Sequence, residues 1–191
     1  MLLRGKYMVR KQLMQSYDGN KIDLDIMIHI DTDCVRECYD SMSCVDFIKY
    51  VTDQYLEAVG GSLTAENMEM LSADQHSLLC YRYMLDEVME GGFIQLVANG
   101  FAPYVLYGPF PYVVKKEWEM RDFSKLLYEA KSECRKHEER IMADMSIDDF
   151  MALYEELEDL NELGDEFLDE YQEKVSPAVA KMIVDNLQKY V

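Results

Sequence analysis

Residues 72–99, SADQHSLLCYRYMLDEVMEGGFIQLVAN, decide the fold. Ser72 is a typical helix N-cap, and Gln75 stands where a capping box places its second partner. Apolar residues then recur at helical spacing until the Gly91-Gly92 pair interrupts the pattern. Because glycine readily adopts the left-handed conformation that ends helices, we expect a helix that stops at this pair. Residues 93–99 are then a second short helix or turn.

The residues around the glycine pair form a compact structural motif. Phe93 follows the glycines and is expected to fold back as a buried anchor. Gln95 and Asn99 lie four residues apart, so one face of a short helix carries both. We expect their side chains to hydrogen-bond the backbone groups that the corner frees, which is a structural role rather than a ligand site.

The N-terminal quarter contains a different pattern. Residues 22–30, IDLDIMIHI, alternate apolar and polar side chains, which predicts a β-strand, with a possible hairpin partner within residues 7–14. Ser43 then resembles an N-cap, and the helical pattern after it ends at Gly60-Gly61.

The second half of the chain is predicted to be helical after a loop at residues 103–111. Residues 112–142 form one expected helix. Another helix starts at the Ser146 cap, and Gly164 is expected to break it. The last helix is expected to begin at Ser176-Pro177, because proline is favoured in the first helical turn. The core candidates of the first of these helices are Trp118, Phe123, Leu126, Leu127 and Tyr128.

These patterns predict an all-α or mainly α protein with a single multi-helix domain. We assign residues 46–191 to this domain and residues 1–45 to an N-terminal extension that carries the possible strand. A chain of 191 residues buries enough surface to need no disulfide or metal. The five irregularly spaced cysteines and the lack of a long apolar run favour a cytoplasmic protein without membrane spans.

Charge is the most informative bulk property. The formal net charge is −18, and residues 141–173 hold thirteen acids without a lysine or arginine. Residues 1–21, in contrast, hold five basic residues against one acid. An acidic surface of this kind repels nucleic acid and anionic membranes and attracts a basic protein. The alternative is that the charge only keeps the protein soluble.

No catalytic or cofactor motif accompanies this charge. The sequence has no phosphate-binding loop, dinucleotide fingerprint, nucleophile elbow or HExxH zinc motif. The three histidines lie on separate predicted elements. We therefore expect no catalytic residues, no cofactor and no metal.

The motif Asp74-x-His76, followed by Glu90-Gly91-Gly92-Phe93-x-Gln95 and Asn99, resembles the signature of a bacterial family of domains of unknown function. The best-understood member of this family is a nineteen-kilodalton DNA-mimic protein. The resemblance covers about residues 70–190, and the chain carries Glu90 where the family pattern has asparagine. It implies a helical, non-enzymatic protein that binds a basic protein, and it suggests a homodimer.

Three functional hypotheses follow. The first is an acidic decoy that occupies the DNA-binding surface of a basic regulator, without binding nucleic acid or membrane itself. The second is an immunity protein that neutralises a basic toxin. The third, less favoured, is an enzyme with a carboxylate-lined pocket beside the glycine corner. The acids expected to contact a partner are Asp148, Asp149, Glu155, Glu156, Glu158, Asp159, Glu162, Asp165, Glu166, Asp169 and Glu170.

Overall fold

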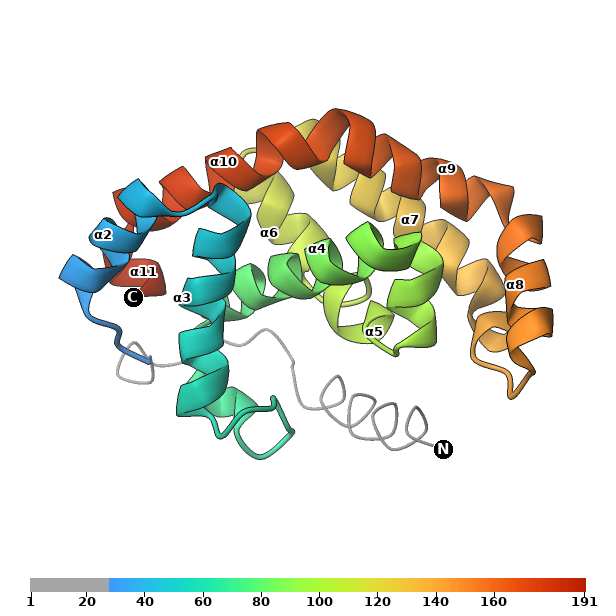
Figure 1. The fold of residues 1–191 in the computed structure, drawn as a ribbon, viewed down its shortest axis with the longest axis horizontal. Coiled ribbons are helices and arrows are strands. Elements are labelled where there is room, and N and C mark those ends of the chain that lie inside the picture. Colours follow the sequence, from blue (N-terminus) through green and yellow to red (C-terminus); the bar gives the residue numbers. More distant parts are fainter. Residues whose placement is uncertain (1–27) are drawn as a thin grey trace.

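The computed structural model describes residues 28–191, and every regular element in this range is helical (Figure 1). The prediction of an all-α or mainly α single domain is therefore confirmed. The proposed hairpin partner and most of the predicted strand at 22–30 lie outside the described residues. Residues 28–30, at its end, form no regular element.

The helices are arranged around α4, which spans Ala73–Ala98. Before α4 come α2 (Thr32–Ser41), α3 (Cys44–Ala58) and the short 3₁₀ turn η1 (Met68–Met70). After it come α5 (Ala102–Val105), α6 (Phe110–Lys116), α7 (Arg121–Ile141), α8 (Ile147–Glu156), α9 (Glu158–Glu166), the π-helical turn η2 (Phe167–Tyr171), α10 (Gln172–Asp185) and α11 (Leu187–Tyr190).

Helix α4 lies at the centre of the molecule. It contacts α3, α5, α7, α9 and α11, and residues 75–81 are buried without exception. A stretch of helix that is buried on all sides needs no polar face. The predicted capping box starts it: the Gln75 backbone N–H donates to Ser72 Oγ at 3.2 Å, and the Ser72 N–H donates to Gln75 Oε1 at 3.1 Å.

Helices α9, η2 and α10 follow one another as a continuous curved rod, drawn in orange to red along the upper edge of Figure 1. The predicted break at Gly164 and the predicted helix start at Ser176-Pro177 are therefore wrong. Gly164 lies inside α9, where its backbone packs against α4. Pro177 lies inside α10, and the burial of the preceding Ser176 against Tyr81 of α4 favours an uninterrupted helix there.

The segment between α4 and α7 is more helical than expected. The predicted loop at residues 103–111 contains most of α5 and the start of α6. The single helix predicted at 112–142 is instead divided after Lys116, and Glu119 has a positive φ of 59°. Four of the five core candidates are buried, but Tyr128 is 41% exposed because it lies on the solvent side of α7.

Helix α2 belongs to the predicted N-terminal extension and packs against α3 and α10 through the buried Val35. Ser43 caps α3, as predicted, by accepting from the Asp46 N–H at 3.1 Å. A division of the chain at residue 45 stays a prediction.

Candidate interaction surface

The glycine pair bends α4 in its last third. Gly91 has φ −166° and ψ 31°, and Gly92 has φ 65° and ψ −168°, so helical geometry is lost at both residues. Phe93 is fully buried directly after the corner. The predicted interruption of the helix and the predicted anchor are both confirmed.

The amides of Gln95 and Asn99 bridge the corner, although not to the partners we expected. Gln95 Nε2 donates to Glu90 Oε2 at 2.9 Å, and Asn99 Nδ2 donates to Glu87 Oε2 at 2.6 Å. These contacts tie the second segment of α4 to carboxylates on the first, rather than to freed backbone groups. Gly91 is required for this arrangement, since a Cβ there would lie 2.3 Å from Gln95 Oε1.

Helix α9 crosses α4 at the same corner. A Cβ added to Gly164 would lie 3.3 Å from Gly92 Cα and 3.9 Å from the Phe93 backbone nitrogen. The two backbones therefore touch where each helix carries a glycine. The crossing fixes the rod, and the acids on its outer side, relative to the central helix.

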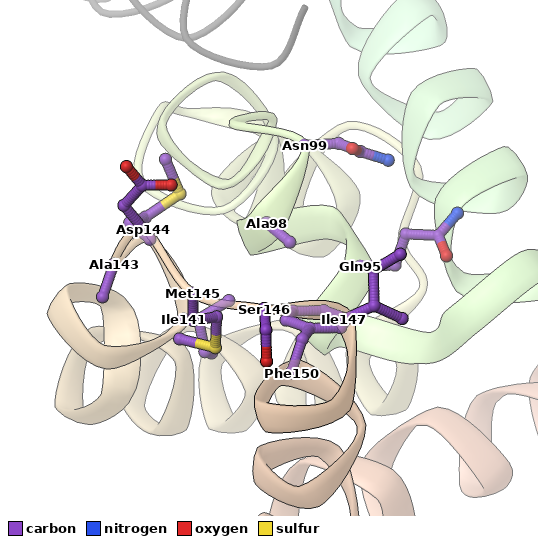
Figure 2. Close-up of a pocket in the computed structure, with 11 residues that line it drawn as sticks. Gln95, Ala98, Asn99, Ile141, Ala143, Asp144, Met145, Ser146, Ile147 and Phe150 are labelled. Carbon is purple, nitrogen blue, oxygen red and sulfur yellow. The ribbon is translucent and has the colours of Figure 1, made fainter. Parts of the chain in front are cut away.

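A pocket of about 550 Å³ lies near the far end of α4 (Figure 2). Gln95, Ala98 and Asn99 line one side, and the loop between α7 and α8 lines the other. Its lining is mainly apolar, and Ile147 at its edge is 81% exposed. This pocket contains one carboxylate, Asp144, and is separate from the outer side of α9.

The eleven predicted partner-binding acids lie on α8 and on the first two elements of the rod, α9 and η2. Ten are exposed, and Glu166 is half-buried. Helix α8 ends at Leu157, whose φ of −88° and ψ of 59° are not helical. The axes of α8 and α9 therefore differ, and the acids of α8 face another direction than those of α9. Figure 1 shows α8 steeply inclined to the rod.

Along the rod, the acids share one side. The buried residues Leu157, Leu160, Gly164 and Phe167 are spaced by three and four residues and face the core. The acids fall between them at helical spacings that place them on the opposite, solvent-facing side. We call this set the α9 face: Glu158, Asp159, Glu162, Asp165, Glu166, Asp169 and Glu170.

Two of the eleven acids are already engaged. Asp149 accepts a hydrogen bond from Ser146 Oγ at 2.7 Å, within the N-terminal cap of α8. Glu156 forms an ion pair with Arg140 at 2.8 Å, and this hydrogen bond lowers the Glu156 pKa. The other nine form no ion pair with any residue from 28 to 191.

Comparison with known proteins identifies the chain's relatives. The family described as DMP19-like protein matches residues 69–190. The chain belongs to this family. The predicted resemblance over about residues 70–190 is therefore confirmed, and the glycine corner and the α9 face both lie within the matched region.

A curated relative in this comparison is DNA mimic protein DMP19 of Neisseria meningitidis serogroup B (strain ATCC BAA-335 / MC58). It is 35% identical over 72 residues, which is 38% of this chain and 43% of the relative. The alignment thus spans less than half of the relative's length.

Within this DMP19-like domain, sequence reasoning missed acids that extend the α9 face. Glu173 is exposed at the start of α10 and continues the rod. Asp122 and Glu129 of α7 lie close enough to the rod to act on Tyr171, whose pKa is raised by burial and then by Glu166, Asp122 and other acids. Asp122 and Glu129 are seven residues apart and therefore lie on one face of α7. This spacing was the signal in the sequence that could have found them.

No group of three or more histidine, cysteine or acidic side chains within 28–191 could hold a metal ion. No helix in this range is long and apolar enough to cross a membrane. His76 of the family motif is buried between Tyr104 and the Met68 carbonyl, at 2.6 and 2.9 Å from its two ring nitrogens.

Proposed function

We propose that the chain is an acidic, non-enzymatic binding protein that mimics DNA and occupies the DNA-binding surface of a basic partner. One observation carries the proposal: the α9 face is a row of seven acids, six of them exposed, that form no ion pair with residues 28–191. Membership of the DMP19-like family and similarity to a DNA mimic protein of Neisseria meningitidis support it.

The density of charge on the rod supports mimicry of a phosphate backbone. From Glu158 to Glu173 the sequence has eight acids and no lysine or arginine. At about 1.5 Å per residue this stretch spans roughly 24 Å, or about 3 Å per charge. One strand of duplex DNA carries a phosphate about every 3.4 Å. Lysine and arginine side chains that bind phosphates would therefore meet carboxylates at a similar density.

The cations of α7, the helix that packs against the rod, do not pair with the acids of the α9 face. On α7, Lys125 pairs with Glu129, Lys136 pairs with Glu133, and Arg135 lies over the Tyr107 ring. None of these three cations contacts one of the seven acids of the α9 face. These acids form no ion pair with residues 28–191, which favours fast association with a basic surface.

The experiment that tests the proposal is capture followed by competition. The purified chain is immobilised and exposed to cell lysate at about 50 mM salt, where charge interactions are weakly screened. Bound proteins are released with duplex DNA and identified. The captured protein is then purified, and its binding to labelled DNA is measured by fluorescence anisotropy with the chain as competitor.

We expect the chain to displace DNA, and the variant Glu162→Gln/Asp169→Asn/Glu170→Gln to compete at least about tenfold less well, since each phosphate-like contact adds to affinity. The matched control Glu37→Gln/Glu57→Gln/Glu69→Gln removes the same charge from exposed positions outside the α9 face. A complex in which the partner holds DNA and the chain together would contradict mimicry, and capture of a toxin that does not bind DNA would favour the immunity hypothesis.

A further inference from the structure

A second, smaller cleft opens at the glycine corner, where α9 crosses α4. Its volume is about 330 Å³, and it lies between the corner, α8 and the first part of the rod, in α9 and the start of η2. The side chains that define its chemistry belong to Glu90, Tyr154, Asn161, Asp165 and Leu168. The cleft borders the α9 face, because Asp165 belongs to both.

The polar lining of this cleft accepts hydrogen bonds. Glu90 and Asp165 contribute carboxylates. Asn161 donates its amide N–H to the Tyr154 carbonyl at 2.8 Å, which fixes the amide, and its Oδ1 is buried without a hydrogen-bond donor. No lysine, arginine or histidine of residues 28–191 lines the cleft. A ligand that suits this lining must be cationic and rich in donors.

The walls of the cleft are fixed and partly apolar. Gln95 holds the Glu90 carboxylate in place, and Gly91, Gly92 and Gly164 leave the backbone uncovered. The Tyr154 side chain and Leu168 add apolar surface. This combination suits a planar cation that is weakly hydrated, because such a group stacks on side chains while its edge donates hydrogen bonds.

We propose that this cleft receives an arginine side chain of the bound partner. The inference rests on the proposed function, and it specifies one contact within the interface. Guanidinium offers five N–H donors in a fixed plane, which matches two carboxylates and an amide oxygen better than the single point charge of lysine. The volume lies at the low end of ligand pockets and fits one side chain.

The test uses the full chain and a small probe. Nα-acetyl-arginine amide is titrated into the ¹⁵N-labelled protein, and the citrulline counterpart serves as the uncharged probe of similar shape. We expect the arginine probe to shift the amide resonances of Gly91, Gly92 and Asn161 with a Kd on the order of 1 mM, the range of a few charge-assisted hydrogen bonds. The citrulline probe should leave them in place.

Variants assign the effect to the cleft. Glu90→Gln and Asp165→Asn should each weaken binding of the arginine probe about tenfold, through loss of a charged hydrogen bond. Glu69→Gln removes the same charge from an exposed position outside the cleft and outside the α9 face, and should leave the Kd unchanged. Equal shifts with both probes, or an equal loss of binding in Glu69→Gln and Glu90→Gln, would overturn the proposal. The titration needs no partner, so its failure is distinct from a failure of DNA competition.

Discussion

Gly92 combines φ 65° with ψ −168°, a backbone region that is essentially restricted to glycine. Any Cβ at this position is strained, and it would also approach the Tyr154 hydroxyl at 3.4 Å. We expect Gly92→Ala to lower the free energy of unfolding by about 1–3 kcal/mol, and Gly92→Val to lower it further because its side chain is β-branched. Thermal melting measures both. An unchanged melting curve for the valine variant would refute this account of the corner.

His76 is a buried neutral base within the same helix. The Met68 carbonyl can only accept, so Nε2 carries the proton and Nδ1 accepts from the Tyr104 hydroxyl. Burial lowers the pKa of His76 from 6.5 to about 4. The unfolded chain therefore takes up a proton that the folded chain excludes, and stability declines as pH falls from about 6.5 towards 4.

The His76 contribution should be about 2 kcal/mol between pH 7 and pH 5. Urea unfolding at the two values measures it, and His76→Gln provides the comparison. The variant loses contacts and is less stable at pH 7, but its stability should fall less between the two pH values, because one titrating group is gone. Equal pH dependence in both proteins would show that His76 titrates normally when folded.

Local chemistry at single residues was predictable, and contacts across the fold were not. The N-caps Ser43, Ser72 and Ser146 act on backbone groups three residues away, so the sequence contains the whole interaction. Gln95 and Asn99 were correctly placed on one face, but their acceptors are side chains on the other segment of α4. That choice depends on how sharply the corner bends.

At the scale of helices, the two errors in the rod have one cause. A glycine and a proline usually interrupt a helix in an isolated segment. Here Gly164 fits a backbone crossing with α4, and Pro177 follows Ser176, whose hydroxyl lies 2.8 Å from that of Tyr81. Tertiary packing therefore overrides local propensity at both residues, and the acids of α9 and α10 lie on one rod instead of two.

The crossing itself can be tested at Gly164. In an exposed helix, alanine is about 1 kcal/mol more favourable than glycine. At this crossing the added Cβ meets Gly92 Cα at 3.3 Å, so we expect Gly164→Ala to give no such gain. Gly164→Leu should lower the free energy of unfolding by about 2 kcal/mol or more through overpacking. Chemical denaturation measures each change.

Ala178→Leu is the matched control, since Ala178 is exposed within α10 of the same rod. It places the same leucine side chain on the rod without a crossing, although it adds one carbon fewer than Gly164→Leu, and should change stability by less than about 0.5 kcal/mol. A stabilised Gly164→Ala variant would mean that α9 moves away from α4 at little cost.

At the scale of the whole molecule, positive and negative charge are separated along the chain. The net charge of −18 and the concentration of acids in residues 141–173 could both be read from the sequence. The sequence could not show that Asp122 and Glu129 border the rod, because α7 approaches it only in the folded protein. Nor could it show that Glu173 lies on the same rod, because that depends on α9, η2 and α10 being continuous.

Repulsion among the acids of the α9 face should lower the stability of the protein when no partner is bound. Like charges three and four residues apart on a helix destabilise it by about 0.2–0.5 kcal/mol per pair, and the α9 face has several such pairs without cations to offset them. We therefore expect added salt to raise the melting temperature. Glu162→Gln/Asp169→Asn/Glu170→Gln should melt higher than the natural sequence at low ionic strength.

The control Glu37→Gln/Glu57→Gln/Glu69→Gln separates local repulsion from net charge. Both triple variants remove three negative charges, so a purely global effect would raise the two melting temperatures equally. Repulsion concentrated on the α9 face predicts a larger rise for the first variant, and the difference should vanish at about 1 M salt, where screening acts over about 3 Å. Such a result would mean that the free chain holds an unfavourable surface, which a basic partner relieves on binding. Equal rises would instead attribute the acids to solubility.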